Sequence, residues 1–122
     1  MSTSETINIK KIHADDVLLL QSIGRQTFKE TFADGNTVEN MRKYLEEGFS
    51  IEKLTSELND KNAAFYLAEN SDNVVGYLKL NFGGSQTELK DEKAVEIERI
   101  YVLKEFHGQN VGQKLYDKAI RV

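Results

Sequence analysis

A glycine-containing turn near the end of the chain carries residues that could bind a phosphate. It runs from His107 to Gln113, contains Gly108 and Gly112, and leads directly into a predicted helix. Glycine lets the backbone approach a bulky anion and adopt conformations that a Cβ forbids. The first N–H groups of a helix are unpaired and lie at the positive end of its dipole. The same spacing occurs more often in tight helix caps, so the turn alone leaves both interpretations open.

Two common phosphate loops are excluded by the residues on the C-terminal side of this turn. No Gly-Lys-Ser/Thr sequence is present there, so the turn is not a Walker loop. Only 10 residues come after Gly112, too few for the second strand and acidic ribose ligand of a Rossmann unit.

The segment before the turn is a strand whose alternation slips. Apolar residues stand at 95 and 97 and then at 100 and 102, so the two-residue period changes phase between Ile97 and Ile100. Such a slip predicts a β-bulge near Glu98 and Arg99, which would leave backbone groups unpaired and available to a ligand. The alternative is that Arg99 and Tyr101 simply face solvent at a sheet edge.

The hydrophobic pattern before these segments predicts the elements that position them. We expect a strand around Ile7 to Ile12, a helix capped by Asp15 or Asp16 and reaching Phe32, and two further helices opened by Thr37 and by Ser50. From residue 62 the period becomes two, which predicts a hairpin of strands 63–69 and 74–82, then a strand over 94–102 and a helix over about 110–121. This order indicates an α+β fold and not a doubly wound sheet.

Length and composition exclude several classes of protein. The 122 residues fit a single domain, 1–122, and the absence of Cys excludes a disulfide scaffold and cysteine-based metal or nucleophile chemistry. With two His we expect no metal site. A net charge of −4 argues against nucleic-acid binding. No apolar run is long enough to span a membrane and no secretory signal is evident, so we expect a cytoplasmic protein without a membrane partner.

The strand, turn and helix together resemble the acetyl-CoA-binding motif of the GCN5-related N-acetyltransferases (GNAT), whose loop reads Arg/Gln-x-x-Gly-x-Gly/Ala. Residues 107–112 match this pattern with His107 in place of Arg or Gln and Asn110 in place of the first glycine, while Gly112 matches. Neither change removes a backbone donor, and Asn tolerates unusual backbone geometry and can cap a helix. Residues 27–32, 36–37 and 49–54 look most like the spermine/spermidine acetyltransferase branch called PaiA.

The resemblance implies a fold, a cosubstrate and its contacts. The fold would be the acyl-CoA N-acyltransferase fold, a central, mostly antiparallel mixed sheet flanked by helices, here without its usual C-terminal strands. The pantetheine arm of acetyl-CoA would lie along the bulged strand, and the pyrophosphate would lie over the turn. The residues implied are Ile100, Tyr101, Val102, His107, Gly108, Gln109, Asn110, Val111, Gly112 and Gln113.

The resemblance also implies a reaction, in which an amine attacks the thioester. An alkyl ammonium has a pKa of roughly 10, so its proton must be removed, and a carboxylate acting directly or through water is the obvious base. Glu96 aligns with the general-base glutamate of histone-acetylating members, and Glu98 lies two residues later. Either carboxylate could instead attract a cationic substrate or merely be solvated. The acidic excess of residues 88–98 favours a polyamine such as spermidine as the small amine substrate.

Two further expectations concern the remaining parts of the fold. Phe28, Phe32, Tyr44 and Phe49 belong to the core or to one wall of an acceptor groove, with the core favoured. Members of the family continue with further strands, so a chain of this length would leave a sheet edge open, which predicts a homodimer or a strand-swapped oligomer. The alternative function is a catalytically impaired remnant that binds coenzyme A or a protein partner without turnover.

Overall fold

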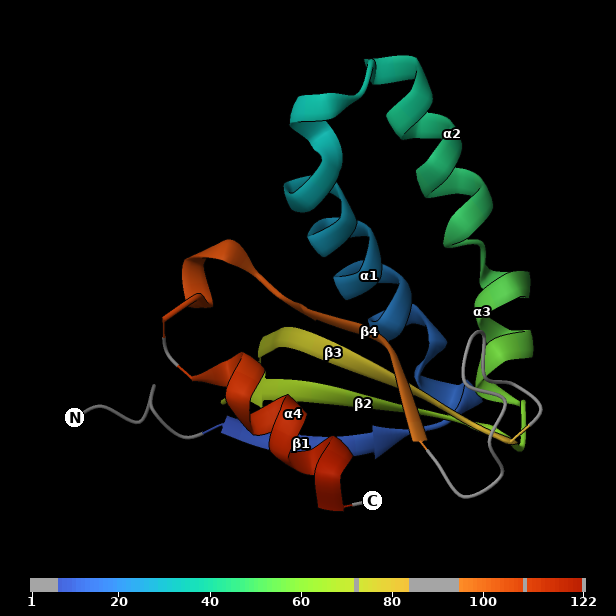
Figure 1. Cartoon of the computed structure of the whole chain (residues 1–122). Helices are drawn as coiled ribbons and strands as arrows, with labels where there is room; N and C mark the ends of the chain where they lie inside the picture. Colours follow the sequence, from blue (N-terminus) through green and yellow to red (C-terminus); the bar gives the residue numbers. More distant parts are fainter. Residues whose placement is uncertain (1–6, 72, 84–94, 109, 122) are drawn as a thin grey trace.

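The elements lie in the order that the periodicity predicts (Figure 1). The computed structural model describes residues 7–71, 73–83, 95–108 and 110–121. The strands are β1 (Ile7–Ile12), β2 (Ala63–Asn70), β3 (Asn73–Phe82) and β4 (Val95–Val102). The α-helices are α1 (Val17–Phe32), α2 (Val38–Gly48), α3 (Ile51–Leu58) and α4 (Val111–Arg121), and short 3-10 turns are η2 (Ala14–Asp16), η3 (Ala33–Gly35) and η5 (Lys104–Phe106).

The described strands form one sheet in the order β1-β2-β3-β4, and each described pairing is antiparallel. The hairpin between β2 and β3 forms as expected, and Ser71 in its turn has a φ of 58°. A register shift between Ala68 and Glu69, which the sequence pattern does not predict, lies close to that turn. Within the described residues β4 is an edge strand, because β3 is its neighbour on one side only.

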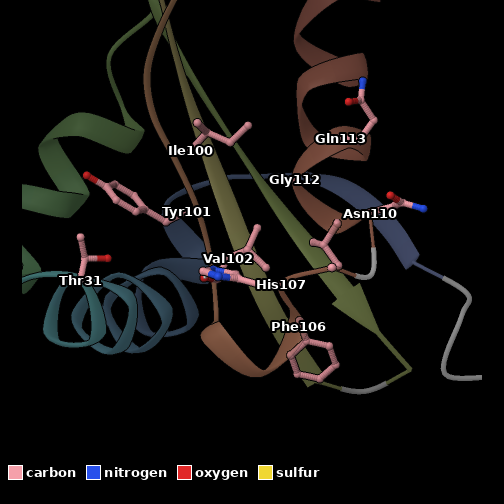
Figure 2. Close-up of a pocket in the computed structure, with 11 residues that line it drawn as sticks. Thr31, Ile100, Tyr101, Val102, Phe106, His107, Asn110, Gly112 and Gln113 are labelled. Carbon is pink, nitrogen blue, oxygen red and sulfur yellow. The ribbon is translucent and has the colours of Figure 1, made fainter.

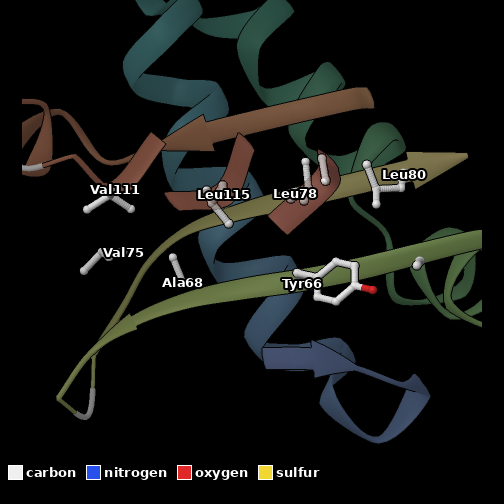
Figure 3. Close-up of a cluster of buried hydrophobic side chains, with 9 residues drawn as sticks. Tyr66, Ala68, Val75, Leu78, Leu80, Val111 and Leu115 are labelled. Carbon is white, nitrogen blue, oxygen red and sulfur yellow. The ribbon is translucent and has the colours of Figure 1, made fainter. Parts of the chain in front are cut away.

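Helices cover both faces of the sheet, and each face has its own apolar cluster (Figure 1). Figure 3 shows the cluster under α4, where Leu115 and Val111 pack against Leu78 and Val75 of β3. On the opposite face, Leu20 of α1 and Leu54 of α3 pack against the strands. Because strand side chains alternate between faces, the sheet joins the two clusters into one fold.

The helix starts agree with their capping residues with one exception. The Thr37 hydroxyl accepts a hydrogen bond from the backbone N–H of Asn40 (3.0 Å), and Ser50 accepts one from Lys53 (3.1 Å), so both predicted caps are confirmed. The predicted start of α1 at Asp16 is confirmed, but the side-chain bond of a cap does not form there. Asp16 stands at the N-cap position without a side-chain cap bond, because the 3-10 turn η2 precedes the helix and Asp16 instead accepts from the N–H of His13 (3.4 Å).

The β-bulge expected near Glu98 is confirmed. Lys79 of β3 faces Arg99, and the next residue, Leu80, faces Ile97, so Glu98 is the extra residue. Glu98 and Arg99 both contact residues on the side of α3, whereas Ile100 after the bulge packs into the α4 cluster. The extra residue therefore explains the phase slip, and it sets the direction of every later side chain in β4.

Candidate functional site

A groove of about 600 Å³ lies between the end of β4, η5 and the beginning of α4 (Figure 2). Nine of the residues named from the sequence line it, namely Ile100, Tyr101, Val102, His107, Gly108, Asn110, Val111, Gly112 and Gln113. Gln109 lies outside the described residues. The groove is also lined by Thr31 and Phe106, which the sequence analysis did not single out. Thr31 belongs to α1 and reaches the groove only through tertiary packing, so no local pattern could have indicated it.

The backbone of β4 is open on the side away from β3, within the part of the chain that the structure describes. Beyond the strand, the N–H of Leu103 donates to the carbonyl of Val75 (2.9 Å), which holds the end of β4 on β3. The Nε2 atom of the His107 ring lies 2.9 Å from the carbonyl oxygen of Val102. Because a carbonyl only accepts, Nε2 carries the proton in this bond. His107 thus ties the turn back to the strand that precedes it.

Two left-handed residues shape the turn. Gly108 has a φ of 88° and Asn110 a φ of 64°, a region in which glycine is unstrained and Asn is the best-tolerated alternative. The carbonyl of Asn110 accepts from the N–H of Lys114 (3.0 Å), which makes Asn110 the N-cap of α4. The next three N–H groups, at Val111 to Gln113, have no partner within an ideal helix. They stand in the lining of the groove.

Gly112 serves a different purpose from the one its spacing indicated. It lies in the first turn of α4 without a left-handed φ, so the expectation of a special backbone conformation there is wrong. A Cβ at this position would meet only Val102 Cγ2, at 3.9 Å. The missing side chain therefore leaves space in the groove where the helix begins.

A second, aromatic pocket of about 270 Å³ lies on the α1 and α2 side of β4. Its lining consists of Phe28, Phe32, Tyr44, Gly48, Phe49, Lys53, Tyr77, Arg99 and Tyr101. Phe28 is the centre of the ring cluster, with centroids 4.7 Å from Phe32, 5.6 Å from Phe49 and 6.1 Å from Tyr44. Phe49 is buried, but Tyr44 is 51% exposed. The four aromatic residues named from the sequence thus form a pocket wall, and only Phe49 is fully part of the core.

Tyr101 lines both cavities. Its ring points toward the side of α1 in Figure 2, whereas Ile100 points toward α4. The ring lies 5.9 Å from that of Tyr77, centroid to centroid, and burial raises the pKa of Tyr77 to about 12. A ligand that lies along β4 in the large groove therefore reaches the aromatic pocket at Tyr101.

A chain of charges surrounds the bulge between β3, β4 and α3. The Nζ of Lys79, a residue 8% exposed, lies 2.9 Å from Glu98 Oε1 and 3.6 Å from Glu57 Oε1. Arg99 pairs with the same two carboxylates: its Nη1 lies 3.2 Å from Glu57 Oε1, and its Nη2 lies 3.3 Å from Glu98 Oε2. Two cations thus alternate with two carboxylates, which allows charges to be held away from water.

The two carboxylates named as catalytic candidates lie side by side on this face. Asn81, which is 1% exposed, donates through Nδ2 to Glu96 Oε1 (3.1 Å) and to Glu98 Oε1 (2.7 Å). The described linings of the large groove and of the aromatic pocket include neither carboxylate. The structure therefore brings Glu96 and Glu98 together through Asn81, beside the aromatic pocket's Arg99.

The charge chain changes the acidity of its carboxyl groups. Burial raises the pKa of Glu98, but hydrogen bonds from Asn81 and Lys79 and the charge of Arg99 outweigh burial and hold this pKa below the usual 4.5. For Glu57 burial also acts to raise the pKa, and the charges of Arg99 and Lys79 outweigh it. Both groups are ionised at neutral pH, and Glu98 is a weak proton acceptor.

Comparison with known proteins places this chain in a family. Residues 26–122 match the acetyltransferase (GNAT) family model. An uncharacterized N-acetyltransferase of Lactobacillus delbrueckii subsp. lactis is 34% identical over 113 residues, which cover 93% of this chain and 65% of that protein. The chain therefore belongs to the GNAT acetyltransferase family, and it spans about two-thirds of the length of that relative.

Two further comparisons concern the branch of the family. A spermidine N(1)-acetyltransferase of Thermoplasma acidophilum is 23% identical over 121 residues, or 96% of this chain and 70% of the relative. The crystal structure of the PaiA N-acetyltransferase of Thermoplasma acidophilum in complex with coenzyme A superimposes with a TM-score of 0.77 at 22% identity, over 95% of this chain and 70% of that one. This likeness confirms the predicted fold.

None of the described helices has the length and apolar character needed to cross a bilayer.

The charge chain predicts how stability depends on pH. Glu57→Gln removes the carboxylate shared by Arg99 and Lys79, and we expect the free energy of unfolding at neutral pH to fall by about 1–3 kcal/mol. Because the pKa of Glu57 is lower in the folded state, its contribution is complete above the unfolded pKa and is lost as pH falls through the folded pKa. Wild type and variant should therefore converge in acid.

Urea unfolding at neutral pH and at about pH 3.5 measures this difference. Glu52→Gln, on the exposed side of the same helix, is the control and should change stability by less than about 1 kcal/mol. An equal loss for Glu57→Gln at both pH values would contradict a paired, ionised Glu57.

Proposed function

We propose that this chain transfers the acetyl group of acetyl-CoA to a primary amine. The observation that carries the proposal is that one groove contains both the open edge of β4 and the first turn of α4, and adjoins an aromatic pocket at Tyr101. A long ligand with an anionic group at one end and a reactive group at the other suits such a groove. Family membership supports acetyl-CoA as that ligand.

The cosubstrate is proposed to lie along the groove with its pyrophosphate at α4. The N–H groups of Val111 to Gln113 and the positive end of the helix dipole would bind the diphosphate, close to Gly108 and His107. Gln109 belongs to the same proposed set. The pantetheine arm would bond to the backbone of Ile100 to Val102. The Val102 carbonyl already accepts a hydrogen bond from His107, so an arm that bonds to this oxygen would use its second lone pair or displace the histidine.

The acceptor is proposed to enter the aromatic pocket, where Tyr101 meets both ligands. A polyamine such as spermidine is the acceptor that the Thermoplasma acidophilum relative supports, and aromatic faces attract ammonium groups. The cations that line the pocket, Lys53 and Arg99, are each paired with Glu57. Of the acidic segment that indicated a polyamine, residues 88–94 lie outside the described part of the chain.

The proposed reaction begins when the neutral amine attacks the thioester carbonyl carbon. A C–N bond forms, the C–S bond breaks, and coenzyme A leaves as the thiolate, which takes a proton from solvent. A backbone N–H near Ile100 to Val102 would stabilise the oxyanion. Before the attack, Glu96 is proposed to remove the proton of the ammonium form, directly or through water, and the proton that the nitrogen loses as the amide forms passes to solvent. Glu98, whose pKa is lowered by its partners, would contribute negative charge and not accept the proton.

A second candidate function is binding of coenzyme A without turnover. It is supported by the hydrogen bonds and ion pairs of the two candidate catalytic carboxylates. Asn81 donates to both Glu96 and Glu98, and Glu98 also pairs with Lys79 and Arg99. A calorimetric titration with coenzyme A and then a thiol-release assay with spermidine separate the candidates. Heat of binding without thiol release would favour this second function.

A cytoplasmic location stays a prediction from the sequence.

The edge of β4 leads to a proposal about assembly. The side of β4 away from β3 has no strand partner among the described residues, and such an edge pairs readily with another chain. We expect a homodimer or a strand-swapped oligomer, which sedimentation velocity detects as a species of twice the monomer mass. Hydrogen exchange of the β4 amides should slow as protein concentration rises. A monomer at all concentrations would contradict this assembly.

The proposed diphosphate site predicts the effect of a charge at Gly112. Gly112→Asp adds a carboxylate to the first turn of α4, where it favours the helix dipole but repels an anionic ligand. We expect the Kd for coenzyme A to rise by at least about 10-fold while the unfolding temperature stays unchanged or rises. Calorimetry and thermal melts measure the two quantities.

Lys114→Gln is the matched control, because it makes the same change of net charge on the same helix outside the groove lining. It should change the Kd by less than about 3-fold. Equal weakening by both variants would show a general effect of charge and would contradict a diphosphate at the helix start.

The proposed base predicts a pH-dependent defect for Glu96→Gln. At neutral pH about 0.1% of an alkyl amine with a pKa of roughly 10 is neutral, compared with about 10% at pH 9. Loss of the base should therefore lower kcat/KM roughly 100-fold at neutral pH and much less at pH 9. Glu98→Gln, on the same strand, should show a smaller loss with no such pH dependence. Equal losses for Glu96→Gln at both pH values would exclude the base role.

A further inference from the structure

A third groove, of about 320 Å³, lies between α1 and α2 and shares no lining residue with the two cavities described above. Its apolar residues are Ala33, Val38, Met41 and Leu45. Met41 is buried at 8% exposure, whereas Val38 is 88% exposed. In Figure 1 the hairpin formed by α1 and α2 extends away from the sheet, so its outer surface is accessible to another molecule.

Three cations border this apolar floor. Arg25 and Lys29 stand one turn apart on α1, and Arg42 stands on α2. All three are exposed, and within the described part of the chain none of them forms an ion pair. Glu39 and Glu46 line a neighbouring pocket together with Arg42 on α2, but neither forms an ion pair with Arg42.

The two α1 cations are unfavourable without a counter-charge, because like charges at i and i+4 on a helix repel one another. Arg42, which has Glu39 and Glu46 at i−3 and i+4 on its own helix, adds positive charge on the other side of the groove. The whole chain has a net charge of −4, so a groove bordered by three cations that form no ion pair among the described residues is a local exception. An anionic occupant would relieve the repulsion, and the apolar floor would bind its apolar part.

We propose that this groove binds an acidic amphipathic helix of a partner protein. From Arg25 to Ala33 the α1 side extends about 12 Å, which equals roughly two turns of a docked helix. Such a helix presents apolar anchors at i, i+4 and i+7, which suit a floor between two helices. Its flanking carboxylates on successive turns would meet Arg25 and Lys29 on one side and Arg42 on the other. A single carboxylate, as in a fatty acid, would leave two of the three cations unpaired.

The probe is a fluorescein-labelled synthetic helix of about four turns, with leucines at i, i+4 and i+7 and glutamates on either side of them. Fluorescence anisotropy against the whole chain should give a Kd in roughly the tens of micromolar, because the groove is small. Binding should weaken as salt is added, since the contacts on the rim are exposed charges. A peptide with lysine in place of each glutamate should not bind.

Charge reversal tests the rim without disturbing the core. Arg25→Glu with Lys29→Glu should weaken binding by at least about 10-fold, since two attractions become repulsions. The matched control is Lys43→Glu with Arg121→Glu, which makes the same change of net charge at exposed residues outside the groove. It should weaken binding by less than about 3-fold. Val38→Ser, at an exposed position, should weaken binding and leave the fold intact.

Three results would overturn the proposal. The first is no anisotropy change at about 1 mM protein. The second is equal binding of the lysine peptide, or equal weakening by the two double variants. The third is binding of dodecanoate, lost on reversal of Arg25 and Lys29, with no binding of the peptide, which would assign the groove to a lipid anion. None of these readouts depends on acetyl transfer, so failure here and failure of the proposed function are distinguishable.

Discussion

Glu98 is one residue more than β3 can pair with, and the architecture around β4 depends on this insertion. A strand alternates its side chains between two faces, so one added residue exchanges the faces for every later residue. Before the bulge Ile97 packs toward α4, and after it Ile100 does. Between them Glu98 and Arg99 face α3, where Glu57 and Lys79 complete a closed set of opposite charges.

The charge set and the groove are parts of one arrangement. Buried charges are tolerated when each is paired, and here the pairs join a helix, a central strand and an edge strand. That connection fixes the strand just before Ile100, where the large groove begins. At the other end His107 and Leu103 hold the exit of the strand. The segment Ile100 to Val102 is thus held at both ends, while no other described strand pairs with its outer backbone edge.

Much of the fold could be predicted from the sequence because helix caps, turns and the β-bulge depend on residues that are close together in the chain. The phase slip identified the bulge, Thr37 and Ser50 identified helix starts, and Gly108 with Asn110 identified a turn with left-handed residues. Asp16 identified the start of α1 as well, although its side chain makes no cap bond because a 3-10 turn precedes the helix. The spacing correctly pointed to Gly112 as a groove residue, but the predicted unusual φ is absent. The glycine instead leaves space in the groove because it has no side chain.

The features that the sequence could not predict depend on contacts between distant segments. Lys79 looks like a solvent-facing residue in an alternating strand, and only α3, folded against that face, encloses it between Glu57 and Glu98. Thr31 enters the groove from a helix about 70 residues away in sequence from β4. The groove between α1 and α2 likewise exists only because two helices pack with their cations on the same side.

The position of Tyr101 has a consequence for how this protein can change through evolution. Its side chain lines both the large groove and the aromatic pocket. A smaller side chain would join the two cavities and a larger one would narrow both. The shapes of the two cavities are therefore coupled at this residue, and a mutation that adapts one cavity must also be acceptable to the other.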